Sequence, residues 1–212
     1  SGCYSRHQAR WHPRFLRRMM LPRAVAVLAV VAIALAADVS NVSKELVDLA
    51  QAAGDDSETA RKLLKHGADT HYRGIHGRTA LVWAVYYRKP KIVLAILEHG
   101  ADTTISDNRG MDATIFAAIN DDEEVLSHLY HHGGDFTFAG PDGRTALHIG
   151  AAHGKKVPVE MMVLAGAPAN RKDMKGFTPL DYATGEAKDY LESIGAEGGG
   201  GPHHKEMLHD EL

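Results

Sequence analysis

Two pairs of adjacent histidines are the residues of this sequence whose type suggests metal binding. The chain contains 14 histidines, and two pairs of them are adjacent, His131–His132 and His203–His204. Neighbouring residues of a helix point about 100° apart, so His131 and His132 cannot both face one ion if a helix carries them. The second pair lies in a glycine-rich tail and is a candidate for weak metal binding only. We therefore predict no metal site.

The acidic run Asp121-Asp122-Glu123-Glu124 has the composition of a calcium site or of an acid–base pair. It lies where a helix is expected to begin, and acidic side chains stabilise the positive end of a helix dipole. The alternating ligand spacing of a calcium-binding loop is absent from it. His148 is expected to be a hydrogen-bonded core residue rather than a catalytic base. The sequence also contains no nucleophile elbow, phosphate loop, dinucleotide fingerprint or His-Glu-x-x-His. We predict no catalytic residue and no cofactor, and we expect a protein that is not an enzyme.

Charge is divided unevenly along the chain. The formal net charge is −3, but residues 1–37 hold six arginines and no acid. The remaining residues, 38–212, hold 18 basic residues (24 minus these six) and all 27 acidic ones, a net charge of −9. Nucleic-acid binding needs a basic surface, so the acidic body argues against it. Because Cys3 is the single cysteine, the rest of the chain cannot form disulfides or zinc thiolates.

The elements that would position any site repeat with a spacing of 33 residues. Three kinds of position share it: loop glycines, glycines at expected helix ends, and small residues inside expected helices. They are Gly77, Gly110, Gly143 and Gly176; Gly67, Gly100, Gly133 and Gly166; and Ala84, Ala117, Gly150 and Ala183. A period of this length is typical of arrays of helical repeats.

Two motifs within the period identify a family. Thr145-Ala146-Leu147-His148 and Thr178-Pro179-Leu180-Asp181 match the Thr-Pro-Leu-His motif of ankyrin repeats, and Leu-Lys-His-Gly-Ala-Asp (64–69) and Leu-Glu-His-Gly-Ala-Asp (97–102) match their ends. Residues 44–197 therefore resemble the ankyrin-repeat family. The resemblance implies an all-α solenoid of about five helix-turn-helix repeats with short β-hairpin loops.

The repeats differ in how closely they follow this pattern. We place a degenerate first repeat at 45–66, then repeats at 74–106, 107–139 and 140–172, and a short fifth repeat at 173–197 that caps the array. The motif threonines Thr79, Thr145 and Thr178 are expected to cap the inner helices, which are the first helices of their repeats. Asp112 replaces this threonine in the third repeat and Asp121 occupies its inter-helix turn, so we expect a local softening there.

Ankyrin proteins usually grip partners with the hairpin tips and the exposed face of the inner helices, and the resemblance implies the same here. Transferred by position, the candidate partner-binding residues are Ile75, His76, Arg78, Tyr86, Tyr87, Asn108, Arg109, Met111, Ile119, Asn120, Asp142, Arg144, His153, Met174, Lys175 and Phe177. Aromatic and arginine side chains concentrate binding energy at interfaces. The alternative is that Tyr86 and Tyr87 merely cover the groove between inner helices.

The N-terminal segment has the three parts of a secretory signal peptide, which we place at residues 19–37. Arginines precede a short apolar run, and small residues suggest cleavage before Ala37 or Asp38. The run is too short for a bilayer span, so no stable membrane span is expected after cleavage. Residues 1–18 are interpreted as an upstream extension. The rival interpretation is a mitochondrial presequence, although such segments are amphipathic and this run is apolar throughout.

The C-terminal segment, 198–212, is expected to be a flexible glycine-rich tail. It ends in His209-Asp210-Glu211-Leu212, the tetrapeptide that a receptor recognises for retention in the endoplasmic reticulum. Asn41 lies in a glycosylation sequon, Asn41-Val42-Ser43.

Together these features predict a non-enzymatic adaptor or scaffold in the lumen of the endoplasmic reticulum. Its partners would be an unidentified protein and the retention receptor. Three alternatives remain: a regulatory subunit of a lumenal enzyme, a weak calcium- or metal-binding lumenal protein, and a cytosolic ankyrin protein whose terminal signals are accidental.

Overall fold

A computed structural model describes residues 38–199 of the chain, and every structural statement below concerns these residues. The expected signal peptide, His203–His204 and the retention tetrapeptide lie outside them. Asn41, the expected glycosylation site, is exposed on the helix that residues 38–51 form.

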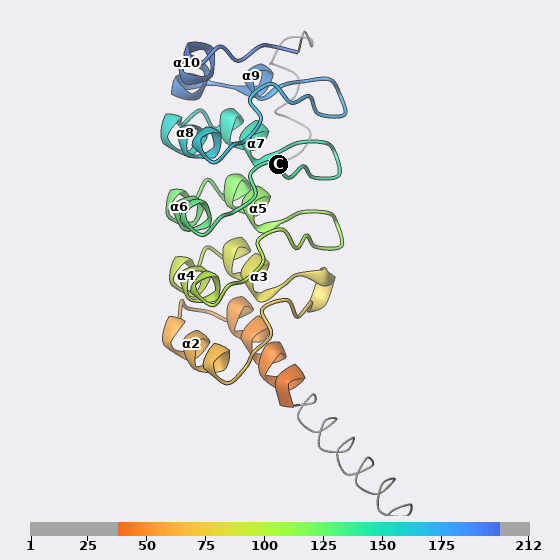
Figure 1. Cartoon of the computed structure of the whole chain (residues 1–212), viewed down its shortest axis with the longest axis vertical. Helices are drawn as coiled ribbons and strands as arrows, with labels where there is room; N and C mark the ends of the chain where they lie inside the picture. Colours follow the sequence, from red (N-terminus) through yellow and green to blue (C-terminus); the bar gives the residue numbers. More distant parts are fainter. Residues whose placement is uncertain (1–37, 200–212) are drawn as a thin grey trace, which may run out of the picture.

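Paired antiparallel helices stack along one axis and form two parallel columns (Figure 1). The inner column comprises α3, α5, α7 and α9, and the outer column comprises α2, α4, α6, α8 and α10. In chain order, the bounds after the helix at 38–51 are α2 Ser57–Lys65, α3 Ala80–Tyr86, α4 Pro90–Glu98, α5 Ala113–Asn120, α6 Glu123–His131, α7 Ala146–His153, α8 Lys156–Leu164, α9 Pro179–Tyr182 and α10 Gly185–Ser193. The predicted all-α solenoid of helix pairs is confirmed.

The loops between successive pairs project from one side of the stack as four hairpins (Figure 1). Each is closed by a backbone hydrogen bond between its first and fifth residues, from Gly74 to Arg78, Asp107 to Met111, Gly140 to Arg144, and Asp173 to Phe177. A single isolated bridge, Ala139–Thr145, is the only β-pairing between residues 38 and 199, so the hairpins are tight turns rather than strands. The first contains a short 3-10 helix, η1 (Ile75–Gly77).

The inner helices begin at capped residues, as expected from the motif. The side chain of Thr79 accepts from the backbone N–H of Val82 at 3.3 Å, and Asp112 accepts from Ile115 at 2.9 Å. At Thr145 and Thr178 a capping box forms: their backbone N–H groups donate to Nδ1 of His148 at 3.1 Å and to Oδ2 of Asp181 at 2.8 Å. Aspartate therefore replaces threonine in the third repeat without loss of the helix start.

Left-handed glycines follow the outer helices. Gly67, Gly100, Gly133 and Gly166 have φ angles of 89°, 75°, 76° and 89°. Glycine adopts this conformation without the steric cost that a Cβ would bring. The expected role of these glycines as helix terminators is confirmed.

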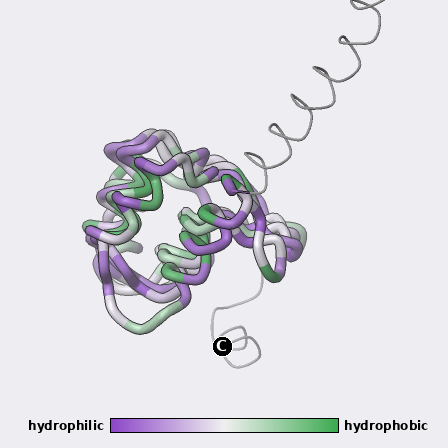
Figure 2. Tube along the Cα trace, turned by 90° about the horizontal axis from the view of Figure 1, so that it is seen from below, coloured by the Kyte–Doolittle hydropathy of each residue, from purple (hydrophilic) through white to green (hydrophobic). Residues whose placement is uncertain are grey.

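Apolar residues fill the space between neighbouring repeats. Ile92, Val93, Ile96 and Leu97 of α4 are buried, as predicted, and so are the small residues Ala84, Ala117, Gly150 and Ala183. Hydrophobic and hydrophilic segments alternate along the helices, as expected for helices that bury one side (Figure 2). In the part of the chain that the structure describes, no helix is long and apolar enough to cross a membrane.

Candidate functional site

An arginine surrounded by aromatic rings lies at the base of the first hairpin. The guanidinium carbon of Arg78 is 4.6 Å from the ring centroid of Trp83, 4.7 Å from that of Tyr86 and 4.8 Å from that of Phe116. Its Nε donates to Oδ2 of Asp107, in the second hairpin, at 3.0 Å. Both partners are buried, so this pair joins two adjacent repeats in a medium of low dielectric constant.

The same arrangement recurs 66 residues later. Arg144, in the third hairpin, lies 3.7 Å from Asp173 in the fourth, and its guanidinium carbon is 4.9 Å from the ring centroid of Tyr182. The Tyr182 hydroxyl donates to Asp173, the ion-pair partner of Arg144, at 2.6 Å. Burial and this hydrogen bond raise the pKa of Tyr182 to about 12. Arg144 therefore links the last two hairpins as Arg78 links the first two.

Between the second and third hairpins this link is missing. Met111 occupies the position of the arginines, and Gly140 occupies that of the aspartates. The backbone bonds follow the same alternation: Asn108 donates to His76 and Met174 donates to Asp142, at 2.9 and 3.0 Å. The equivalent residue in the third hairpin is Pro141, which has no N–H. The hairpins are thus joined in two pairs.

Tyr86 and Tyr87 extend the aromatic cluster to the surface. They are 43% and 46% exposed, whereas Trp83 beneath them is 6% exposed. The Tyr87 and Trp83 rings are stacked with centroids 5.7 Å apart, and Tyr86 makes edge contacts with Trp83 and Phe116 at 5.8 and 5.7 Å. Both tyrosines are therefore held on a rigid support with about half of their surface open. They cover a neighbouring ring and also present a surface, and that this surface binds a partner stays a prediction.

Most of the transferred positions are open to solvent. Eleven of them are exposed and three, Met111, Asn120 and Arg144, are partly buried. The exposed set is Ile75, His76, Tyr86, Tyr87, Asn108, Arg109, Ile119, Asp142, His153, Met174 and Lys175. Whether these residues bind a partner stays a prediction.

Two expected surface residues are not on the surface, and this is a correction. Arg78 is 7% exposed because Asp107 and three rings enclose its guanidinium group, and Phe177 is 6% exposed because it packs against Tyr182. They support the neighbouring hairpins from within. Conversely, the motif positions did not include Arg73, Arg88 and Lys172, which are exposed cations. They flank the motif, and their positive charge is the only sequence signal that could have identified them as candidates.

The residues considered for chemistry have structural roles. His148 is buried, accepts from Thr145 at Nδ1 and lies 3.3 Å from the Phe177 carbonyl oxygen at Nε2. Burial lowers its pKa, as expected for a neutral core histidine. Asp122 caps α6 by accepting from Val125 at 3.2 Å. Among residues 38–199 no three histidine, cysteine or acidic side chains are grouped closely enough to hold a metal ion.

A buried lysine of the second repeat is hydrogen-bonded to the end of the first helix. The Nζ of Lys89 donates to the carbonyl oxygens of Leu49 and Ala52, at the end of the first helix, and Lys89 is 5% exposed. Burial lowers its pKa. Two shallow surface depressions near the starts of α8 and α10 share Lys156 and Glu186, and neither brings together groups suited to catalysis.

The comparison with known families agrees with this geometry. Residues 40–107 match the family model described as ankyrin repeats (three copies). These residues are ankyrin repeats. The later helix pairs repeat the same arrangement and are consistent with further ankyrin repeats. No curated protein matches the chain. Ankyrin repeats are generally protein-binding and typically non-catalytic.

Proposed function

We propose that the protein is a non-enzymatic adaptor or scaffold that binds a protein partner on its inner surface. The inner surface is defined as the exposed residues of the four hairpins, of the residue directly before each hairpin, and of the C-terminal ends of the inner helices. The observation that carries the proposal is the Tyr86–Tyr87 pair, half exposed on a buried platform of Trp83 and Phe116. Rigid aromatic side chains lose little entropy on binding, and they dominate the energetics of many interfaces.

Comparison of two variants tests this proposal. The full chain, its Tyr86→Ala/Tyr87→Ala variant and its Leu164→Ala variant would be immobilised and exposed to a microsomal extract. Leu164 is 67% exposed at the end of the outer helix α8, so its truncation removes exposed apolar surface away from the inner surface. We expect the double tyrosine variant to lose a partner that the wild type and Leu164→Ala retain. Equal retention by all three would place the binding site elsewhere.

We also propose that the protein resides in the lumen of the endoplasmic reticulum. Two independent sequence features support this location: the arginine-then-apolar segment at 19–37 and the tetrapeptide His209–Leu212. The only cysteine precedes the expected cleavage point, which suits an oxidising compartment.

Localisation of an internally tagged chain tests this second proposal. We expect the intact chain in the lumen and a chain that lacks His209–Leu212 in the medium. If neither enters the secretory pathway, the location is wrong, and only the binding proposal remains.

A further inference from the structure

We propose that the inner surface recognises an extended acidic segment of its partner, with an aromatic or aliphatic side chain that packs on Tyr86 and Tyr87. This inference rests on the proposed function and adds the chemical class of the partner. It follows from the charges of the inner surface, from the way its acidic residues are paired with cations, and from the two half-exposed tyrosine rings.

Exposed cations line the inner surface from the first hairpin to the last. The set comprises Arg73, Arg88, Arg109, Lys172 and Lys175. Arg73 and Arg88 donate to the carbonyl oxygens of Ser106 and Asn120, which leaves their charge uncompensated. None of the five has a carboxylate partner within ion-pair distance among the residues that the structure describes.

Four acidic residues of the hairpins and inner-helix ends lie beside cations. Asp107 pairs with Arg78 at 3.0 Å, and Asp142 and Asp173 lie 3.4 and 3.7 Å from Arg144. Asp121, at the end of α5, lies 2.7 Å from the Nζ of Lys155. These four carboxylates share three cations, Arg78, Arg144 and Lys155, whereas the five cations above have no carboxylate partner, so the inner surface keeps a positive excess.

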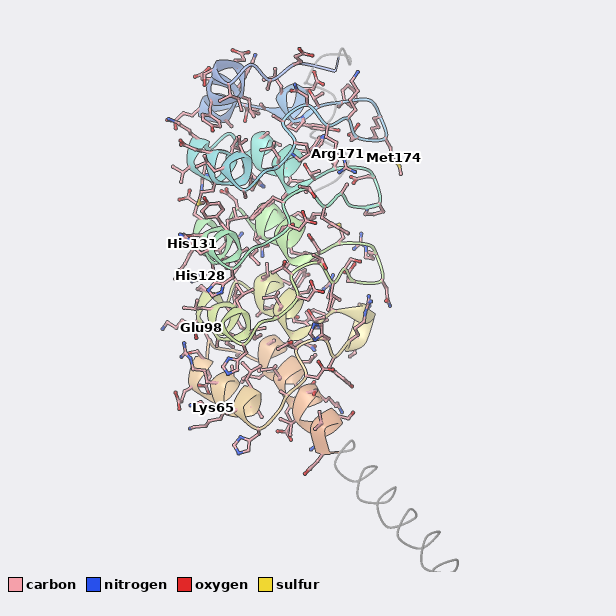
Figure 3. All side chains as sticks on the ribbon, in the orientation of Figure 1. Lys65, Glu98, His128, His131, Arg171 and Met174 are labelled. Carbon is pink, nitrogen blue, oxygen red and sulfur yellow. The ribbon has the colours of Figure 1, made fainter. Side chains whose placement is uncertain are left out.

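The opposite, outer edge carries charges of both signs, and several of them are paired with each other, as in Glu58–Lys62, Glu98–Arg61 and Glu192–Lys188. Its acidic residues include Glu58, Glu98, Glu123, Glu124, Glu160 and Glu192. Figure 3 shows Glu98, Lys65, His128 and His131 along this edge, whereas Arg171 and Met174 lie on the hairpin side. A positive surface on an otherwise acidic body, of net charge −9 for residues 38–212, directs an acidic partner to one side. The same negative body repels a nucleic acid, which needs a broad basic footprint.

The Trp83 ring, which both tyrosines contact, carries a donor that nothing in the described chain satisfies. The Nε1 of Trp83 is buried and has no hydrogen-bond partner there. A buried N–H without an acceptor costs free energy. Trp83 is covered by the rings of Tyr86 and Tyr87, whose centroids lie 5.8 and 5.7 Å from its own.

The stack also sets the spacing that such a segment would need. Packed helices lie about 8–10 Å apart, and an extended chain advances about 3.3 Å per residue, so about three residues of a segment span one repeat. Arg109 and Lys175 occupy equivalent tip positions two repeats apart. Acidic residues separated by about six positions would reach both tips.

Selection from a random dodecapeptide library on the immobilised full chain tests the inference. We expect the selected peptides to be enriched in aspartate and glutamate and to carry one aromatic or aliphatic residue. We also expect at least tenfold weaker binding, by fluorescence anisotropy, when every acid of a selected peptide is replaced by its amide. Selection of uncharged or basic peptides, or of none, would overturn the inference, and so would tighter binding of a thymidine oligonucleotide than of the peptides.

Charge reversal locates the site. Arg109→Glu/Lys175→Glu is expected to weaken binding of the selected peptides at least tenfold. Lys62→Glu/Lys65→Glu makes the same change in net charge on α2, in the outer column, and is expected to leave binding unchanged. Equal loss in both variants would mean that only overall charge matters and would reject the proposed site. If Arg109→Glu/Lys175→Glu retains the cellular partner and Tyr86→Ala/Tyr87→Ala loses it, the binding function stands and the acidic partner does not.

Discussion

At the scale of single residues, the third repeat contains the largest departure from its neighbours. Asp112 replaces a threonine, is fully buried, and accepts from Ile115 and from the hydroxyl of Thr114. Burial is the main reason that the pKa of Asp112 is raised to about 6, and the negative charge of the nearby Asp135 also raises it. The hydrogen bonds that make it a good cap do not fully compensate for the loss of water.

The Asp112→Asn substitution should make this cost visible as a pH dependence. Folded Asp112 holds its proton to higher pH than the unfolded chain does, so wild-type stability falls relative to Asp112→Asn as pH rises from about 4 to 6. The total change is on the order of 3 kcal/mol. Urea denaturation of both proteins at several pH values measures it. A difference that stays constant over this range would show that the carboxyl is not desolvated.

Two glycine substitutions separate backbone strain from steric contact. Gly133 and Gly143 both have positive φ, at 76° and 81°. A Cβ on Gly133 meets nothing within 4 Å, whereas one on Gly143 lies 2.8 Å from the backbone nitrogen of Met174. Gly133→Ala is therefore expected to cost only the strain, about 1–2 kcal/mol.

Gly143→Ala is expected to cost more, because the third and fourth hairpins must also move apart. Thermal or urea denaturation of the two variants gives the comparison. Equal costs would mean that the fourth hairpin yields freely, and an unchanged Gly133→Ala midpoint would contradict the assigned role of that glycine.

At the scale of elements, the hairpins are joined in pairs rather than in one continuous row. Arg78–Asp107 joins the first two and Arg144–Asp173 joins the last two, with one backbone hydrogen bond beside each pair. The helices at the middle junction are still linked, because Lys155 contacts both Asp121 and Glu123. The weaker point is thus confined to the hairpin side.

Hydrogen exchange should reveal this junction. The backbone amides of Gly140 and Gly143 close the third hairpin, and they are expected to exchange faster in the wild type than in a variant that has an amide at position 141. The reason is that Pro141 gives the third hairpin no bond to the second.

Reciprocal substitutions provide the control for this prediction. Pro141→Asn restores an amide at the position where Asn108 donates in the second hairpin, and it should slow exchange at Gly140 and Gly143. Asn108→Pro removes the bond to His76 and should speed exchange at Gly110. No change in either variant would mean that the bonds between hairpins do not govern local opening.

At the scale of the whole molecule, stability depends on contacts between neighbouring repeats. Each repeat packs only against the adjacent ones. The array is therefore expected to unfold in one cooperative transition only if the stabilising free energy of the interfaces exceeds the free energy by which single repeats are unstable. Ala117 is fully buried in α5, which packs against both α3 and α7. This position therefore couples the two halves of the array.

Ala117→Leu is expected to uncouple these halves. Overpacking costs about 1–3 kcal/mol and should separate one urea transition into two. In a Trp11→Phe background, Trp83 fluorescence reports the N-terminal half and circular dichroism reports all helices, so the two signals should cease to coincide. Leu164→Ala, at an exposed site, serves as the control and should keep coincident transitions. Coincident transitions in Ala117→Leu would show that this interface is not limiting.

Sequence by itself determined the repeat length, the helix pairs and their ends. Glycines at positive φ and caps at helix starts act within a few residues of the chain, so their spacing is sufficient to place them. The replacement of threonine by Asp112 was also visible, and so was its ability to cap. The strongly exposed tip residues Ile75 and Met174 followed from the same register.

Only the tertiary structure decided which side chains on the inner surface are free. Arg78 and Phe177 are the last residues of their hairpins by register, yet they are buried because residues about one repeat away or on the next helix enclose them. The pairing of hairpins likewise depends on contacts across 29 residues, such as Arg78 with Asp107. A local pattern fixes where a residue lies within its repeat. Its exposure and its charge partner depend on the repeat beside it, and stacking alone brings that repeat into place.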